Sequence, residues 1–235
     1  MPHSTVTYGQ ERICFNVLYG NRKTMAIEVF PDRSVVIKAP VGTALEEIRR
    51  RVSKRIRWVL KQQHYFEQFE PRTPERQFVG GETHLYLGRQ FRLKISTGSH
   101  DSVKLSRGYF FVEAKDSADV DQIRLLLGRW YADKAKITFT DSFARCWPYF
   151  EKLELKKPRL QIRRMQKRWG SLSQGGLLTL NPALIRAPKD CIDYVITHEL
   201  CHLQCHDHSS EFYRLLERVM PDWEKRKHKL ELALV

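Results

Sequence analysis

Histidines, cysteines and carboxylates crowd into one short segment of the sequence, VITHELCHLQCHDHSSEFY, at residues 195–213. His198 and His202 are four residues apart, which on an α-helix places both imidazoles on one face, close enough to bind the same ion. Glu199 lies between them on the same turn, where its carboxylate can reach water beside the ion without being a ligand. The spacing therefore predicts a metal site on a helix with an acid–base group next to it.

These residue types suit hydrolysis at zinc. Neutral imidazoles leave the ion with its positive charge, so that zinc lowers the pKa of the water that it binds, and three protein ligands keep one position open for substrate. Glu199 would accept the proton of that water and pass it to the leaving group. This is the H-E-x-x-H arrangement of zinc peptidases. We therefore interpret His198 and His202 as ligands of Zn²⁺ and Glu199 as the general base.

The third metal ligand depends on where this helix ends. If the helix continued past His202, Cys205 would stay on the same face one turn later, and its thiolate could complete a His-His-Cys site. If the helix ended near Gln204, a turn could bring His208 back to the metal. We favour His208, because residues that cap helices surround it and apolar residues then recur at helical spacing. The caps are Asp207, Ser209 and Ser210, and the apolar positions are Phe212, Leu215, Leu216 and Val219.

Cys201 and Cys205 offer an alternative, a closed structural zinc site of four protein ligands that includes histidines of the same segment. Such a site normally gathers its ligands from two separated segments, and the rest of the sequence has no second pair of closely spaced cysteines or histidines. Both cysteines are more simply interpreted as small apolar core residues. We therefore prefer a catalytic metal site.

The elements that must position this site begin with a β-rich N-terminal region over residues 1–117, which carries one basic amphipathic helix. Strand-like runs lie at 12–20, 24–30, 34–40, 84–96, 102–106 and 108–114. The first three runs predict an antiparallel meander, and a connector rich in proline and glycine near residue 75 separates them from the others. Thr43 and Glu46 form a capping box for the helix that follows the meander.

Residues 118–235 are interpreted as a helical connector followed by the metal-binding catalytic region. A long helix is expected from about Asp119 to Leu153, with a kink or break at Pro148. Strand-like runs come next, and the helix of the metal site has Pro188 in its first turn. Strands followed by helices predict an α+β fold.

The chain is strongly basic, with 41 Lys and Arg residues against 27 Asp and Glu residues, a net charge of +14. Such a surplus favours polyanionic partners, so that nucleic acid or a nucleotide could bind through a basic surface. The densest basic patch lies on the helix after residue 43, at Arg49, Arg50, Arg51, Lys54, Arg55, Arg57 and Lys61. Trp58, Tyr65 and Phe66 lie close by and could stack on bases, although aromatic residues at helical spacing more often belong to a core.

The five cysteines lack the spacing of a disulfide framework. The first residues lack the apolar core of a signal peptide, and no apolar run approaches the length that spans a membrane. We expect a cytoplasmic protein without a membrane partner.

The run RRMQKRWGSLSQGGLLTLNPALIRAPKDCIDYVITHELCHLQCHDHSSEFYRLLERVMPDWEKRKHKL resembles the core of the YgjP-like, SprT-related zinc metallopeptidase family. The resemblance covers roughly residues 160–230, and the elements before them agree with the family in layout only. It implies a zincin-like fold, in which the helix that carries the metal ligands packs on a small sheet. It also implies that His198, His202 and His208 bind the metal and that Glu199 is catalytic.

The same resemblance bears on the surroundings of the site. The frequent WGSC of the family is WGSL here, with Leu172 in the cysteine position, so that this cysteine is not needed for the chemistry. Residues 177–185 would border the cleft as an edge strand that aligns an extended peptide. Trp169, Gly170 and Ser171 are interpreted as turn residues, and either Asp193 or Asn181 as the residue that orients a metal-bound imidazole.

The leading functional hypothesis is a zinc metallopeptidase that acts on a peptide or an unfolded protein. A second hypothesis is a metal-dependent nucleoside triphosphate pyrophosphatase, whose phosphate grip would come from scattered Arg and Lys because the sequence has no Gly-rich phosphate loop. A third is a nucleic-acid-binding module with a structural zinc. Binding to DNA that depends on salt but survives removal of zinc would indicate a separate basic surface.

Overall fold

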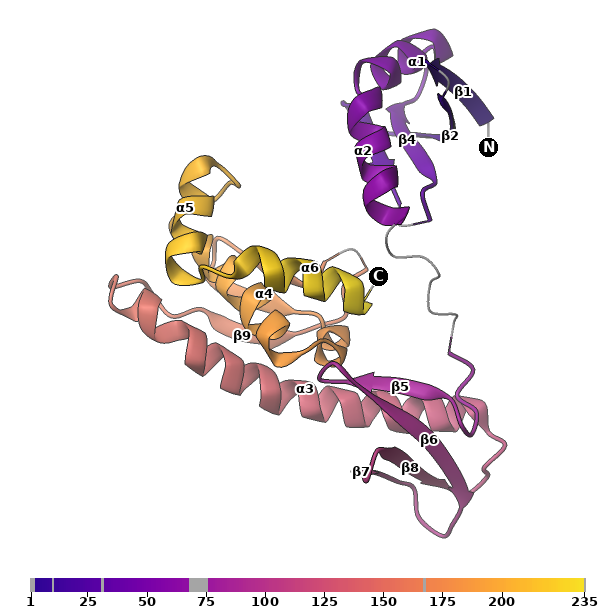
Figure 1. Ribbon diagram of the computed structural model, residues 1–235, viewed down its shortest axis with the longest axis vertical. Helices are drawn as coiled ribbons and strands as arrows, with labels where there is room; N and C mark the ends of the chain where they lie inside the picture. The colour runs from indigo at the N-terminus through magenta and orange to yellow at the C-terminus, as the bar shows by residue number, and fades with distance from the viewer. Residues whose placement is uncertain (1–2, 10, 31, 68–75, 167, 235) are drawn as a thin grey trace. The chain divides into compact units, whose positions relative to one another are not determined.

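The computed structural model describes residues 3–9, 11–30, 32–67, 76–166 and 168–234. The chain divides into two units, Met1–Thr73 and Pro74–Leu234, and both mix helices with small sheets (Figure 1). This division differs from the expected boundary after residue 117, because the strands over 83–114 share one hydrophobic core with the helices that follow them. No helix of the described residues is long and apolar enough to cross a membrane.

The first unit contains a sheet of β1 (His3–Tyr8), β2 (Glu11–Gly20), β3 (Ala26–Val29) and β4 (Val35–Pro40) in the order β1-β2-β4-β3. β1 with β2 and β3 with β4 are antiparallel, but β2 and β4 are parallel, so that the predicted meander is wrong. Alternate residues of β4 are buried whereas those of β3 are only partly buried, which suits β4 to the interior of the sheet and β3 to its edge.

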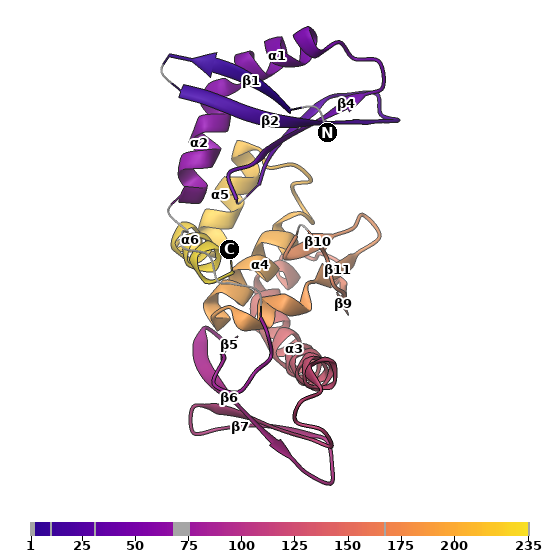
Figure 2. The same cartoon turned by 90° about the vertical axis from the view of Figure 1, so that its right-hand side faces the viewer.

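Two helices, α1 (Leu45–Lys54) and α2 (Ile56–Glu67), cover one face of this sheet (Figure 2). The sequence predicted a single helix, but Arg55, with φ of −106° and ψ of 8°, separates α1 from α2. The predicted capping box is also wrong, because Ala44 is the N-cap residue and the Thr43 hydroxyl donates to the Pro40 carbonyl at 2.9 Å. Ile48, Val52 and other apolar residues of the helices pack on β2 and β4.

The second unit begins with a sheet of β5 (Thr83–Tyr86), β6 (Arg89–Thr97), β7 (Ser102–Ser106) and β8 (Tyr109–Ala114), in the order β5-β6-β8-β7. The helix α3 (Val120–Glu151) follows, and the Asp119 side chain caps it by accepting from the Gln122 N–H at 2.9 Å. The predicted long helix is confirmed. Pro148 does not break it, because the helix continues through this residue and ends at Glu151.

A second small sheet and the helical segments over residues 182–201 pack against α3, which runs along the unit (Figure 1). The sheet consists of β9 (Arg159–Ile162), β10 (Gly170–Leu172) and β11 (Leu177–Leu180), in the order β10-β11-β9. A 3-10 helix, η1 (Pro182–Arg186), leads to α4 (Lys189–Cys201), α5 (Ser210–Val219) and α6 (Trp223–Leu234). The helix α4 lies in the centre of this part and contacts α3, α5, α6 and β10.

The turn between β5 and β6 supports the start of α4. The backbone N–H groups of Leu87 and Gly88 donate to the carbonyls of Ile185 and Arg186 in η1, at 3.0 and 2.9 Å. Pro188, the residue before α4, lies against Gly88. The sheet of β5 to β8 is therefore hydrogen-bonded to the segment that leads into α4, the helix of the site.

Candidate metal centre and its cleft

The helix α4 is held on nearly all sides. Most of its residues are buried, and they belong to the core that α3, α5 and α6 also line. At its first turn, the Asp190 carboxylate bonds Lys229 Nζ of α6 at 2.8 Å. A helix fixed in this way carries its side chains to defined positions, which a metal site requires.

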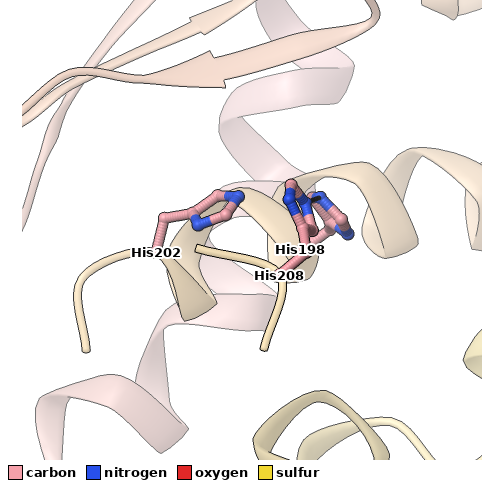
Figure 3. A group of neighbouring side chains, drawn as sticks. All are labelled: His198, His202 and His208. Carbon is pink, nitrogen blue, oxygen red and sulfur yellow. Dashed lines mark hydrogen bonds between the residues drawn. The ribbon is translucent and has the colours of Figure 1, made fainter. Parts of the chain in front are cut away.

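Three histidines converge at the end of α4. His198 lies in its last turn, His202 is the C-cap residue, and His208 lies just before the N-cap of α5. One nitrogen of each lies within 4.8 Å of the others, and Nε2 of His198 is 3.0 Å from Nε2 of His208. Figure 3 shows the three imidazoles turned toward one another.

The chain turns away from the helical path after Cys201, so that Cys205 does not continue the face of His198 and His202. Within the part of the chain that the structure describes, no cysteine joins the histidine cluster. Cys201 is buried, and burial raises the pKa of its thiol to about 12. The geometry thus gathers three imidazoles, and neither a His-His-Cys set nor a four-ligand set with cysteine.

The environment keeps two of these imidazoles, those of His198 and His208, neutral. Burial first, and then the charges of the neighbouring His208 and His202, lower the pKa of His198 to about 3. Burial, followed by the charge of His202, also lowers the pKa of His208. Neutral imidazoles present the lone pairs that zinc accepts, and three nitrogens close together match the donor set of a catalytic zinc site. The residues present therefore fit a zinc ion.

The contact that orients one imidazole comes from the backbone. Nδ1 of His202 lies 2.9 Å from the carbonyl oxygen of Cys205, so that Nδ1 donates and Nε2 keeps its lone pair for a metal. Neither residue proposed for this role from the sequence performs it. Asp193 pairs with Arg145 at 2.9 Å, and the amide of Asn181 donates to the carbonyls of Met165 and Arg168.

Glu199 lies beside the histidines with only 9% of its surface exposed. Burial raises the pKa of its carboxyl group to about 7, against the backbone N–H of Leu172 and the charge of Arg168, which lower it. Gly170 lies against this side chain, and a Cβ placed on Gly170 would be 2.9 Å from Oε1 of Glu199. The carboxylate is thus confined between α4 and β10.

A cleft of about 760 Å³ contains the histidines and Glu199. The strand β10 borders it, and not β11 as the sequence suggested, because β11 is the middle strand of its sheet and β10 is an edge. Gly170 and Ser171 therefore belong to this edge strand and are not simply turn residues. The helix α6 also lines the cleft, with Lys227, Leu230 and Glu231.

Sequence reasoning missed four contributors to this site. Two of them are backbone groups, the Leu172 N–H and the Cys205 carbonyl. The third is α6, which packs beside the cleft. Neither kind of contribution leaves a local pattern in the sequence. Tyr194 lines the cleft one turn before His198, with its ring centroid 5.8 Å from that imidazole. Its spacing of four residues from His198 is the one signal that could have identified it.

Comparison with known proteins identifies the family of this chain. The family model of the YgjP-like metallopeptidase domain matches residues 23–233. No curated protein matches the chain. Among solved structures, the crystal structure of the metallopeptidase zymogen of Pyrococcus abyssi abylysin is similar, with 28% sequence identity over 39% of this chain and 87% of that chain, and a TM-score of 0.33. Because the family model matches most of its length, the chain belongs to the YgjP-like metallopeptidase family.

Proposed function

We propose that this metallopeptidase is zinc-dependent, with His198, His202 and His208 as the zinc ligands and Glu199 as the general base. One observation carries the proposal: three imidazole nitrogens within 4.8 Å of one another share a cleft with a buried carboxylate. The packing of α4 against β10 supports a zincin-like arrangement, in which the helix of the metal ligands lies on a small sheet.

A bound zinc ion would supply Lewis-acid chemistry, which acidifies water and polarises a peptide carbonyl. The residues of this chain supply the rest. The three imidazoles hold the ion, and the Cys205 carbonyl fixes the tautomer of His202. Burial of His198 and His208 lowers the pKa of both and keeps them unprotonated near neutral pH.

Glu199 would accept a proton from the attacking water at a carboxylate oxygen and deliver it to the amine nitrogen that leaves. A base works best when its pKa lies near the working pH, and burial raises the pKa of Glu199 to about 7. That pKa would fall when a divalent cation binds nearby. The Leu172 N–H restrains the carboxylate, so that the proton acceptor keeps its place.

The substrate we propose is an extended peptide or an unfolded protein that pairs with β10. The Trp169 carbonyl accepts from the N–H of Asn181, the residue after β11, at 2.9 Å, and the Ser173 N–H donates to the Leu177 carbonyl of β11 at 3.0 Å. Because bonding directions alternate along a strand, Gly170 and Leu172 direct their backbone groups to the opposite side, and the Leu172 N–H reaches Glu199. The free carbonyls and the Gly170 N–H at this edge could bind a substrate backbone by strand addition.

The test is cleavage of an unfolded protein by the zinc-loaded chain, with Glu199→Gln at equal zinc content as the control. Glutamine keeps an oxygen that accepts from the Leu172 N–H but cannot take a proton. We expect zinc binding to remain and cleavage to fall by about 100-fold to 10,000-fold. Full activity of this variant would refute the role of Glu199.

Nucleoside triphosphates assayed in parallel test the alternative hypothesis of a nucleoside triphosphate pyrophosphatase. Their hydrolysis without peptide cleavage would overturn the proposed peptidase.

A further inference from the structure

A groove of about 460 Å³ lies in the first unit, away from the histidine cluster in the chain. Its lining comes from the segment at the start of β3 and from the junction of α1 and α2: Met25, Ile27, Arg51, Lys54, Arg55 and Trp58. The junction exists because the helix is interrupted at Arg55, which brings the last turn of α1 and the first turn of α2 to one place. We call this surface the Trp58 groove.

Trp58 presents a large apolar surface to solvent. Its neighbours Ile56 and Val59 are buried in the core of the unit, whereas 41% of Trp58 is exposed. The indole therefore belongs to the groove wall and not to the core position that its helical spacing favoured. With Met25 and Ile27 beside it, an exposed planar ring offers a stacking surface for another flat, apolar group.

The other lining residues are cationic, and none of the described residues that line the groove carries a carboxylate. Among the described residues, Lys54 and Arg55 have no ion-pair partner, while Arg51 bonds Glu47 at 2.7 Å. Positive charge continues outside the groove, at Lys61, one turn after Trp58 on α2, and at Arg50, whose side chain is 68% exposed and lies 4.0 Å from the Glu47 carboxylate. The groove is thus a stacking surface inside a longer cationic track.

We propose that the Trp58 groove binds single-stranded nucleic acid, with a base stacked on Trp58 and phosphates contacting Lys54, Arg55 and Arg51. A duplex keeps its bases stacked on each other, whereas an unpaired strand can place a base on an aromatic side chain. An acidic peptide could meet the cations but brings no flat ring for the indole. A single nucleotide would leave Arg50 and Lys61 unused, and for this reason we favour a strand. This function goes beyond the proposed peptidase and does not depend on a metal.

The test is fluorescence anisotropy of a labelled unpaired DNA strand of about 20 nucleotides with the full-length protein. Trp58→Ala should weaken binding by about fivefold to about 100-fold, and Trp58→Phe should recover most of this loss because it keeps a stacking ring. Lys54→Gln/Arg55→Gln should weaken binding and reduce the slope of log affinity against log salt by about 1.4, the value for two phosphate contacts on a single strand.

A matched control removes the same charge from a second surface that combines cations with aromatic rings. Lys94 lies over the rings of Tyr109 and Phe111 on the sheet of β5 to β8, and Lys104 pairs in register with Phe111. Lys94→Gln/Lys104→Gln should leave binding almost unchanged, as should a chelator and Glu199→Gln. The last two results separate this proposal from the zinc site.

Four outcomes would overturn the proposal. Unchanged binding by Trp58→Ala would mean that no base stacks there, and a loss confined to the Lys94→Gln/Lys104→Gln variant would move the site to the other surface. Equal affinity for a duplex would exclude recognition of unpaired bases. Competition by a mononucleotide as effective as that of the strand would make the groove a nucleotide site.

Discussion

Gly170 and Glu199 are in contact across the boundary between the edge strand β10 and the helix α4. A Cβ on Gly170 would lie 2.8 Å from Cγ and 2.9 Å from Oε1 of Glu199, and 2.9 Å from Cγ1 of Val195. The absence of a side chain at position 170 therefore sets how closely the strand approaches the helix. The same approach lets the Leu172 N–H reach the Glu199 carboxylate.

We expect Gly170→Ala to reduce peptide cleavage by about 10-fold to 100-fold, because the strand or the carboxylate must move. We also expect it to cost about 1–3 kcal/mol in the free energy of unfolding. Gly175→Ala is the control, since a Cβ there would meet only Ser173 Oγ, at 3.8 Å. Cleavage rates and urea unfolding of both variants check this, and equal behaviour of the two would contradict the role of Gly170.

If His208 is the third ligand, His208→Ala should weaken zinc binding strongly. Loss of a residue that only hydrogen-bonds a metal ligand typically weakens binding by about 10-fold to 100-fold, and we expect the loss of His208 to exceed this. Cys205→Ala should keep zinc affinity, because Cys205 contacts His202 through its backbone carbonyl, which alanine retains. Competition with a chromogenic zinc chelator measures both affinities without any need for activity. The reverse result would make Cys205 the ligand.

The parts of the site that the sequence indicated are those that local geometry determines. The four-residue spacing of His198 and His202 fixes their common face once a helix forms. Ser209, one of the residues that the sequence offered as a cap, is the N-cap residue of α5, although its side chain makes no capping hydrogen bond. The extent of α3 was predictable for the same reason, because its cap and its apolar pattern lie within the segment itself.

What the sequence did not reveal depends on pairing between distant segments. The order β10-β11-β9 and the parallel pairing of β2 with β4 arise from packing of whole layers, and a strand carries no local mark of its neighbour. β11 is nearly fully buried and β10 only partly, which suits the middle and the edge of a sheet. This difference appears only after folding, and so β11 was wrongly expected at the cleft.

Gly88 tests whether the first sheet of the second unit supports α4. Its φ is +76°, and a Cβ there would lie 2.5 Å from Cγ of Pro188, the residue before α4. Gly108→Ala is a matched control, because its φ is +82° in another turn of the same sheet and nothing lies within 4 Å of its Cβ. Both variants bear the cost of a positive φ, about 1 kcal/mol.

We expect Gly88→Ala to lose about 1–3 kcal/mol more than Gly108→Ala in the free energy of unfolding, from the collision with Pro188. We also expect only Gly88→Ala to lower zinc affinity, since it disturbs the start of the helix that carries His198 and His202. Urea unfolding and chelator competition measure the two effects. Equal losses in both variants would show that the turn does not support α4.

A buried pair at the start of β5, Glu82 just before the strand and His84 within it, makes the same unit sensitive to acid. Nε2 of His84 lies 2.8 Å from Oε2 of Glu82, with side-chain exposures of 4% and 14%. The Glu82 carboxylate also accepts from the N–H groups of Gln77 and Phe78, at 2.8 and 2.9 Å. Burial lowers the pKa of His84 below its ordinary value of 6.5, although the charge of Glu82 opposes this shift.

The sign of the pH effect follows from proton uptake. Well above pH 6.5 the imidazole is neutral in both states, but as the pH falls toward and below 6.5 the unfolded chain takes up a proton that the folded His84 does not. Stability should therefore fall with acidification, and His84 should account for up to about 1.4 kcal/mol of the loss one pH unit below 6.5. His84→Gln keeps an amide that can donate to Glu82 but does not titrate. On acidification this variant should therefore lose less stability than the parent protein, by up to about 1.4 kcal/mol. Urea unfolding of both zinc-loaded proteins above and below pH 6.5 measures the difference, and parallel losses would mean that His84 is not the group responsible.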